Sequence, residues 1–387
     1  MFLFIARSYI LDKFMLDNKK KFIVVICANS SWYIYNFRKN TIKAFVKEGH
    51  QVIVVAPQDE YSKYFLGLGS KHYKLNLNPS GTNPFKEIWA IFKLISLYLY
   101  IRPNFVMNFT PKMNVYSTIA SIFSRSKTIN NISGLGSVFI KDSFFSKFVS
   151  LLYRITQIFS VKVFFQNKED MEMFISRKIV PRYKCEYIPG SGVDVEWFDL
   201  KEAPDDGVVR FIIVCRMLYA KGIDRYAKAA EQCREKYGDK VEFIAVGFID
   251  KNNKRAVPIE VMADWESKGV LIYKGAVADV RPEVALSDCI VLPSVYPEGT
   301  PRSLLEGASM GKPIITTNMP GCASTIENGV NGFLCRPWST SDLVLCMEKI
   351  INMTHERRLK MGLKSRELVK RKFDEQIVIK KYLKSLY

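Results

Sequence analysis

Histidine is scarce in this chain of 387 residues: there are only three, and they lie far apart in the sequence. Histidine clusters that bind metals are therefore not expected. The eight cysteines form no Cys-x-x-Cys pair, which disfavours zinc and disulfide frameworks and favours a reducing cytosol. Uninterrupted apolar runs long enough to span a bilayer are also missing, so no transmembrane helix is predicted.

The N-terminal residues 1–20 do not fit a secretory signal. Their apolar run is interrupted by Arg7, lacks a small-residue cleavage site and precedes basic residues. We therefore expect this segment to be an interfacial or disordered extension.

Positive charge is in excess and unevenly spread. Residues 1–200 hold 27 basic and 14 acidic residues, a net charge of +13 out of +19 for the chain. A basic first half fits an anionic surface, either lipid headgroups or nucleic acid, or else a solvated face without a partner. Apolar residues make up 48% of the chain, as in globular proteins, and the length favours two domains of about 150–200 residues.

Short β-branched runs alternate with segments of helical period along almost the whole chain. Apolar strands separated by helices are typical of parallel sheets covered on both faces, so we predict an α/β fold with two doubly wound domains. The polar segment Trp197–Val208 is predicted to be a linker. The predicted strands are Phe22–Ala28, Gln51–Pro57, Phe105–Phe109, Lys127–Ser133, Val161–Gln166, Cys185–Pro189, Val209–Cys215, Glu242–Gly247, Val270–Gly275, Cys289–Val295 and Pro313–Thr317.

Two predicted helices of the first half, Phe85–Ile101 and Phe144–Phe159, are crowded with aromatic residues and sparsely basic. Both are expected to pack on a sheet. Their aromatic, lysine-edged surface also fits docking at a membrane interface, in the same half of the chain that carries the charge excess.

The segment Pro293–Leu334 carries the strongest chemical signal. After a buried strand, Thr300 suits a helix N-cap and Pro301 the first helical turn. A helix N-terminus at the carboxyl end of a parallel strand is an anion site, and a diphosphate would fit there. Two carboxylates eight residues apart, Glu298 and Glu306, frame this position.

This region resembles the Glu-x7-Glu motif of the retaining GT-B glycosyltransferases, family 4. Other matches follow in the right order over residues 21–387: Gly49-His50-Gln51-Val52, Ile188–Asp194, and Arg216 followed by Lys221-Gly222. Further details resemble the branch of that family that builds bacterial glycans on undecaprenyl diphosphate: Ala56–Tyr61, Thr110-Pro111-Lys112, Gly134-Leu135-Gly136 and Phe165-Gln166-Asn167.

The resemblance implies two Rossmann-like domains facing across a cleft. Residues 21–199 would bind the acceptor near the membrane, residues 200–374 the nucleotide sugar, and residues 375–387 would return to the first domain. It further implies that a hexose or N-acetylhexosamine moves from a nucleotide sugar, most often a UDP sugar, to a lipid-linked saccharide, with retention of configuration. This chemistry requires neither metal nor cofactor, and it takes place on the cytoplasmic face of the membrane.

Candidate residues follow from the chemistry and the resemblance together. Breaking a sugar–diphosphate bond develops negative charge, which Arg216 and Lys221 suit. Glu306 has the carboxylate that could accept hydrogen bonds from a ribose diol, and the resemblance implies that Glu298 approaches the hydroxyls and reacting centre of the donor sugar. The other donor-side candidates are Gly299, Thr300, Pro301, Arg302, Gly247, Gly275 and Val277. The acceptor-side candidates are Asn29, Ser31, Lys112 and Asn131.

The sequence departs from the family pattern on the acceptor side, because Asn29–Tyr33 lacks the usual Gly-Gly pair and a histidine is missing near Ser133 or before Lys112. Alternatives also remain. The scarcity of histidine disfavours a UDP-sugar epimerase of the same fold. A non-catalytic binder of nucleic acid or membrane is supported only by the net charge, and no nucleic-acid-binding motif is found in the sequence. A dehydrogenase would need a Gly-x-Gly-x-x-Gly turn after the first strand, and none is there.

Overall fold

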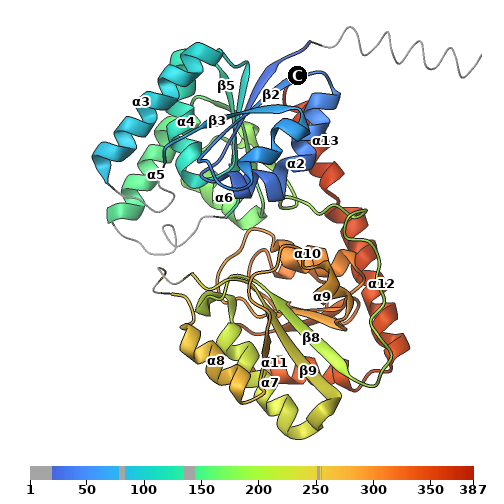
Figure 1. Ribbon diagram of the computed structural model, residues 1–387. Coiled ribbons are helices and arrows are strands. Elements are labelled where there is room, and N and C mark those ends of the chain that lie inside the picture. Colours follow the sequence, from blue (N-terminus) through green and yellow to red (C-terminus); the bar gives the residue numbers. More distant parts are fainter. Residues whose placement is uncertain (1–19, 78–82, 135–143, 251–252, 254) are drawn as a thin grey trace, which may run out of the picture.

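The computed structural model describes residues 20–77, 83–134, 144–250, 253 and 255–387, which form two α/β domains stacked one above the other (Figure 1). The predicted N-terminal extension, apart from Lys20, lies outside the described residues. So do Leu135 and Gly136 of the family-like motif.

The first domain is built on a parallel sheet with strand order β3-β2-β1-β4-β5-β6-β7. The order reverses between β1 and β4, which is the switch point where doubly wound sheets bind ligands. The strands are β1 (Ile23–Cys27), β2 (Gln51–Ala56), β3 (Ser70–Lys74), β4 (Phe105–Asn108), β5 (Lys127–Ile132), β6 (Ser160–Phe165) and β7 (Cys185–Tyr187).

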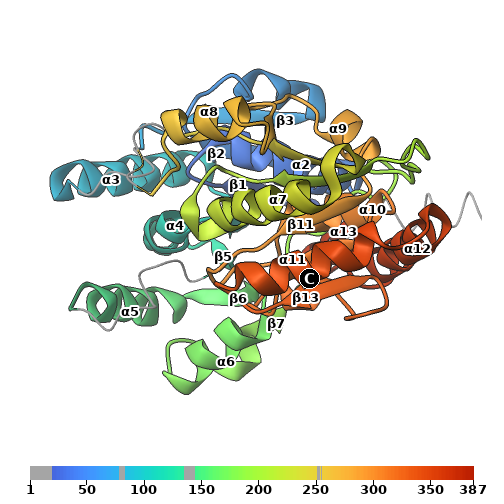
Figure 2. The same cartoon turned by 90° about the horizontal axis from the view of Figure 1, so that it is seen from below.

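Helices cover both faces of this sheet. On one face, α2 and α13 pack against side chains such as Val24 and Ile26 through Phe45 and Tyr382. On the other face, α3, α4, α5 and α6 cover the alternate residues of the same strands (Figures 1 and 2). The helices are α2 (Ser31–Lys47), α3 (Pro84–Ile101), α4 (Pro111–Ser124), α5 (Phe144–Gln157), α6 (Lys168–Ser176) and α13 (Glu375–Lys384).

The second domain repeats the plan with strand order β10-β9-β8-β11-β12-β13, and its switch point lies between β8 and β11. The strands are β8 (Val209–Val214), β9 (Val241–Val246), β10 (Ile272–Tyr273), β11 (Cys289–Leu292), β12 (Ile314–Thr317) and β13 (Gly332–Cys335). The helices are α7 (Ile223–Tyr237), α8 (Ile259–Ser267), α9 (Arg281–Ala285), α10 (Arg302–Ser309), α11 (Thr340–Ile351) and α12 (His355–Lys372). Short 3-10 helices in the connections are η1 (Ser62–Tyr64), η2 (Leu66–Leu68), η3 (Arg182–Lys184), η4 (Tyr219–Lys221), η5 (Gly238–Lys240) and η6 (Ala323–Thr325).

The chain passes between the domains twice, and the two crossings lie side by side. Val193 accepts a hydrogen bond at its carbonyl from the Glu375 amide (3.0 Å), and its own amide donates to the Phe373 carbonyl (2.9 Å). Gly192 has a φ of 71°, and a Cβ there would collide with the Glu375 backbone. The second crossing leads into α13, whose Tyr382 lies in the first domain's core.

The predicted fold of two doubly wound domains is confirmed, with one difference in the domain boundary and one in the set of strands. Val193, Val195 and Phe198 already pack in the second domain's core, before the boundary expected at residue 199, because the polar linker begins after the actual crossing. The strands β3 and β13 were not predicted. Both are edge strands, with one neighbour each, so their sequences need less apolar character.

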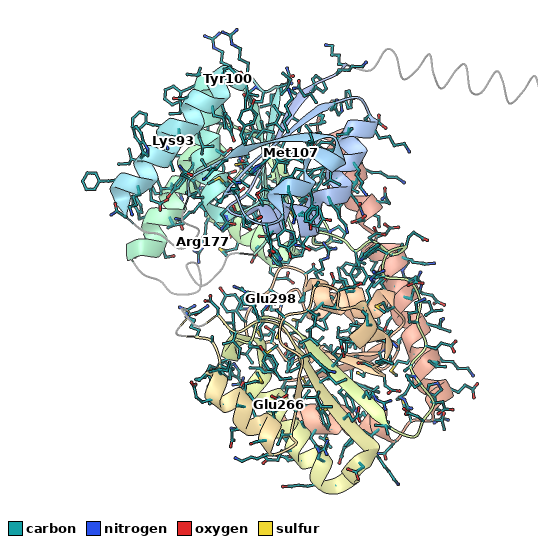
Figure 3. All side chains as sticks on the ribbon, viewed as in Figure 1. Lys93, Tyr100, Met107, Arg177, Glu266 and Glu298 are labelled. Carbon is teal, nitrogen blue, oxygen red and sulfur yellow. The ribbon has the colours of Figure 1, made fainter. Side chains whose placement is uncertain are left out.

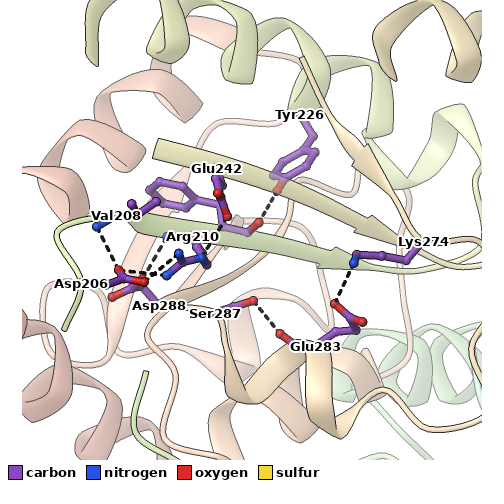
Figure 4. A network of polar contacts seen from close by, with 10 residues as sticks. Asp206, Val208, Arg210, Tyr226, Glu242, Lys274, Glu283, Ser287 and Asp288 are labelled. Carbon is purple, nitrogen blue, oxygen red and sulfur yellow. Dashed lines mark hydrogen bonds and ion pairs between the residues drawn. The ribbon is translucent and has the colours of Figure 1, made fainter. Parts of the chain in front are cut away.

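Hydrogen bonds and ion pairs hold the linker against the second domain where β8 begins (Figure 4). Arg210 of β8 donates to Asp206 of the linker (3.1 Å) and to Glu242 of β9 (2.9 Å). Its amide donates to the buried Asp288, which also accepts from Arg358 of α12 (2.8 Å). These charge-assisted bonds hold the linker, the sheet and α12 as one unit.

Candidate active site

A cavity of about 650 Å³ is lined by residues of both domains. Glu298 lies at this boundary between the domains (Figure 3). The second domain contributes Val214, Cys215, Arg216, Lys221, Phe248, Leu292, Glu298, Gly299, Thr300, Pro301, Arg302 and Ser303. The first domain contributes Trp32, Tyr33, Phe37, Ser133, Gln166 and Ser191.

Glu298 is fixed in the loop between β11 and α10 by partners from its own domain. Its Oε1 accepts hydrogen bonds from Lys221 Nζ, in a close ion pair, and from Ser294 Oγ (2.9 Å). Lys221 ends η4 and precedes Gly222, whose φ of 77° favours glycine and whose Cα lies against the Pro293 carbonyl. The loops after β8 and β11 are thereby packed together.

Arg216 follows β8 and lines the cavity with an exposed side chain. Its guanidinium makes no hydrogen bond or ion pair with any residue that the structure describes. Lys221 and Arg216 thus reach the same cavity in different states, one cation paired and one open to an anionic ligand.

The loop 298–302 also contacts the first domain. Thr300 Oγ1 donates to the Gln166 carbonyl (3.3 Å), Asn167 Nδ2 donates to the Glu298 carbonyl (3.3 Å) and Arg302 Nη1 donates to the Asn36 carbonyl (2.7 Å). The prediction that Thr300 caps α10 was therefore wrong. The helix begins at Arg302 after Pro301, without a side-chain cap, and the Thr300 hydroxyl bridges the domains instead.

Glu306 does not line the cavity. It lies one turn along α10, where its Oε1 accepts from Arg302 Nε (2.8 Å), and Arg302 does line the cavity. Burial raises the pKa of Glu306 above its ordinary value, although the Arg302 guanidinium opposes this shift. The carboxylate therefore sits beside the cavity, bound to the cation that separates it from the open space.

The candidates after β9 and β10 lie outside the cavity lining. The Gly247 amide donates to the Gly275 carbonyl (2.8 Å), and Gly247 lies so close to the Cys215 carbonyl that a Cβ would not fit. Val277 packs against the domain core. These three residues are absent from the lining, but the neighbouring Phe248 belongs to it.

The four acceptor-side candidates lie away from the lining and have partners within the first domain. Ser31 is buried and donates to the Pro57 carbonyl (2.7 Å), and buried Asn131 accepts from Tyr382 (2.7 Å). Lys112 pairs with Glu87 (2.9 Å), and the amide of half-buried Asn29 donates to Thr110 (3.2 Å). Their place near strand ends was visible in the sequence, but the direction of their side chains was not.

Sequence reasoning missed the first-domain lining residues. Trp32, Tyr33 and Phe37 come from the first two turns of α2, whereas Ser133, Gln166 and Ser191 follow β5, β6 and β7. The aromatic run after the first strand was a signal that the sequence offered. Gln166 and Ser191 lie in the family-like segments Phe165-Gln166-Asn167 and Ile188–Asp194, but only the fold brings them together with Ser133.

Among residues 20–77, 83–134, 144–250, 253 and 255–387, no group of three or more His, Cys, Asp or Glu side chains is arranged to hold a metal ion.

A second surface stands out on the first domain, which we call the α3–α5 apolar face. Its side chains are large, apolar and exposed, and they lie on three neighbouring helices or directly after α5. Lys93 and Tyr100 mark α3 in Figure 3. The face consists of Phe85, Ile88, Trp89, Phe92, Leu99, Tyr100, Ile122, Phe123, Phe148, Leu151, Ile155, Ile158 and Phe159.

The charges around this face are almost all positive. The three helices contain one acidic residue, Glu87, which pairs with Lys112. Exposed cations include Lys86, Lys93 and Arg154. None of the helices in the described part of the chain has the length and apolar composition that a membrane crossing needs.

Comparisons with known families match both domains. Residues 23–167 match the family model described as glycosyl transferase 4-like, and residues 209–353 match the model of glycosyl transferases group 1. The two matches fall on the first and second sheet respectively.

Similar proteins span most of the chain. A relative from Campylobacter jejuni, named N,N'-diacetylbacillosaminyl-diphospho-undecaprenol alpha-1,3-N-acetylgalactosaminyltransferase, is 27% identical over 91% of this chain and 94% of its own. An Escherichia coli relative, named UDP-Gal:alpha-D-GlcNAc-diphosphoundecaprenol alpha-1,3-galactosyltransferase, is 27% identical over 71% of each chain. The structure of Anabaena HepE in complex with UDP and glucose superposes with a TM-score of 0.76 at 16% identity, covering 94% of this chain and 99% of that one. The last match supports the GT-B fold.

Proposed function

Because the chain belongs to the group 1 glycosyltransferases, we propose that it transfers a hexose or N-acetylhexosamine from a UDP sugar to a saccharide linked to undecaprenyl diphosphate. The names of the C. jejuni and E. coli relatives describe transfer to acceptors of this kind. The observation that carries the proposal is the meeting of Arg216, Lys221 and Glu298 in one interdomain cavity.

The leaving UDP is stabilised by positive charge from the second domain. Arg216 is open to an anion and presents a planar fork that matches a phosphate. Ser303 lies in the first turn of α10, whose free amide groups and dipole favour the diphosphate at the same place. Such preorganised groups act where charge develops in the transition state.

Lys221 and Glu298 exchange partners when the donor binds. In the structure the ammonium group of Lys221 pairs with the Glu298 carboxylate. A diphosphate attracts Lys221, which leaves Glu298 Oε1 to accept hydrogen bonds from the sugar hydroxyls. Glu298 then positions the donor sugar while Lys221 stabilises the leaving group.

Transfer with retention of configuration follows if the acceptor hydroxyl attacks from the side of the leaving diphosphate. The bond between the anomeric carbon and the phosphate oxygen breaks, the bond to the acceptor oxygen forms, and the acceptor proton passes to the departing phosphate. Neither an enzyme nucleophile nor a metal takes part in this scheme, because Arg216 and Lys221 supply the positive charge.

The proposal includes peripheral binding to the inner face of the cytoplasmic membrane through the α3–α5 apolar face. Its aromatic side chains suit the headgroup boundary, and the surrounding lysines suit anionic lipids. This places a lipid-linked acceptor and the first domain at the same surface.

The activity is tested with a panel of UDP sugars and N-acetylglucosamine linked through diphosphate to a short prenyl chain, followed by linkage analysis of the product. We expect one donor to be used with retention. Lys221→Ala and Glu298→Gln should each lower kcat by about 100-fold or more, because each removes a group that acts in the transition state.

The matched control is Lys268→Ala, which removes an exposed lysine that pairs with Asp264 on the surface of α8. It should retain full activity. Near-normal rates for both site variants would refute the assigned roles. An epimerised UDP sugar formed without acceptor would show a different reaction.

A further inference from the structure

We propose that Trp32 forms the platform on which the acceptor sugar stacks, so that α2 sets acceptor recognition. This inference rests on the proposed function, since it assigns the acceptor side of the same cavity. The cavity has two chemically different walls: cations and Glu298 from the second domain, and an aromatic cluster from the first.

The aromatic wall leaves one ring open. Phe37 is covered by the Arg302 guanidinium, which lies 4.9 Å from its ring centre, and is flanked by Tyr33 at 4.9 Å. The Trp32 ring is nearly perpendicular to the Phe37 ring at 5.5 Å between ring centres, yet Trp32 keeps 44% of its surface exposed while lining the cavity. Phe37 thus packs against Trp32, and a large part of the Trp32 side chain remains available to a ligand.

One buried polar group on the same wall lacks a partner among the described residues. Gln166 lines the cavity and is only 6% exposed, and its Nε2 makes no hydrogen bond within the described residues. A buried amide donor without a partner is costly, so a ligand hydroxyl or carbonyl oxygen is expected to satisfy it. Both Gln166 and Trp32 therefore point to a ligand that has apolar and hydrogen-bonding surfaces.

A buried cation holds this wall in place. Arg38 is 1% exposed, stacks 4.4 Å from the Phe109 ring centre, and donates through Nη2 to Ser191 Oγ (3.0 Å) and Tyr33 Oη (3.3 Å). Ser191 and Tyr33 both line the cavity. Their oxygens are consequently fixed before any ligand binds, which lowers the entropic cost of recognition.

A pyranose ring fits this wall better than the other parts of the two substrates. One face of the ring is formed by C–H groups that pack on an aromatic plane, while its edge carries hydroxyls for Gln166 and Ser191. The diphosphate of UDP is drawn to Arg216 and Lys221 on the opposite wall. The acceptor sugar is therefore the part left to meet Trp32.

The test compares Trp32→Ala and Trp32→Phe with the wild type, using UDP binding and steady-state kinetics with prenyl-diphosphate N-acetylglucosamine. Trp32→Ala should raise the KM for this acceptor about tenfold, the scale of one lost stacking contact, with UDP affinity unchanged. Trp32→Phe should recover most of the loss. Tyr183→Ala, an exposed aromatic before β7 in the same domain, is the matched control and should behave as the wild type.

The outcomes separate the alternatives. Weaker UDP binding by Trp32→Ala would overturn the proposal and assign Trp32 to the nucleotide base, and an unchanged acceptor KM would also overturn it. If the wild type transfers no sugar, the proposed function fails. Equilibrium titration with the acceptor then decides the role of Trp32 by itself: weaker binding by Trp32→Ala supports it, and equal or absent binding refutes it.

Discussion

At the level of single residues, the two glutamates of the motif are held by different cations. Glu298 pairs with Lys221 from another loop, whereas Glu306 pairs with Arg302 on its own helix. The first pair spans the space where we propose that the diphosphate binds, so a ligand can separate it. The second pair is built into α10, where the Arg302 guanidinium opposes the rise in the Glu306 pKa that burial causes.

The raised pKa of Glu306 predicts how donor binding responds to acid. If Glu306 accepts hydrogen bonds from the ribose diol, as the sequence led us to expect, Arg302 has to move away from it, and UDP affinity should fall as the pH drops through this pKa, above the ordinary glutamate value of about 4.3. Glu306→Gln should bind UDP about tenfold more weakly at neutral pH and lose this acid dependence.

Calorimetric titration of UDP across pH 4 to 8, roughly the range around the ordinary glutamate pKa, measures this effect. Glu266→Gln, an exposed glutamate on α8, serves as the control. An identical fall of UDP affinity at low pH in Glu306→Gln and the wild type would exclude Glu306 as its source.

The free energy of unfolding depends on pH in the opposite direction. Because the folded-state pKa of Glu306 is raised, its contribution to stability decreases as pH rises through the window between the unfolded and folded pKa values.

At the level of elements, the loop 298–302 joins the motif helix to the opposite domain. A Cβ on Gly299 would lie 2.5 Å from the Ser133 carbonyl oxygen and 2.7 Å from Gln166 Oε1. Its φ is not in the left-handed region, so the absence of a side chain matters for the close approach of the domains and not for the turn itself.

Gly299→Ala should therefore disturb the contact between the domains more than the fold. We expect kcat to fall at least about tenfold, because misplacing the reacting groups by about 1 Å costs up to two orders of magnitude. The melting temperature should change little, and small-angle scattering should show a larger radius of gyration. The control is Gly67→Ala, because Gly67 has open space around it and no left-handed φ. Wild-type kinetics in Gly299→Ala would refute the importance of the contact.

The same loop shows what could be predicted from the sequence. The interior strands and the strand–loop–helix at Glu298 were predicted because their apolar runs and motif spacing are local. The true start of α10 was missed, since Thr300 finds its partner, Gln166, in the other domain. Of the four edge strands, β7 and β10 were predicted and β3 and β13 were missed, and the aromatic run of α2 was visible in the sequence although its place in the cavity was not.

At the level of the whole molecule, the α3–α5 apolar face predicts reversible membrane binding. Trp89→Ser together with Phe92→Ser should abolish co-sedimentation with anionic vesicles, because both side chains are exposed there and would enter the interface. Binding by the wild type should weaken with salt, since lysines contribute electrostatically. Activity on a short-chain acceptor should persist in the double variant.

The control for this experiment removes two exposed apolar side chains of the second domain, Leu345→Ser with Leu363→Ser. This variant should sediment with vesicles as the wild type does. Equal vesicle binding by both double variants would contradict the proposed membrane-binding face. Wild-type binding to neutral vesicles at high salt that equals its binding to anionic vesicles would show that the lysines contribute no electrostatic attraction.

The paired chain crossings at Val193 restrict how the two domains can move relative to each other. Two backbone bonds tie that residue to Phe373 and Glu375, so the two crossings cannot move apart without breaking both bonds. Any wider separation of the domains on the cavity side would also have to break the contacts of the loop 298–302 with Gln166, Asn167 and Asn36.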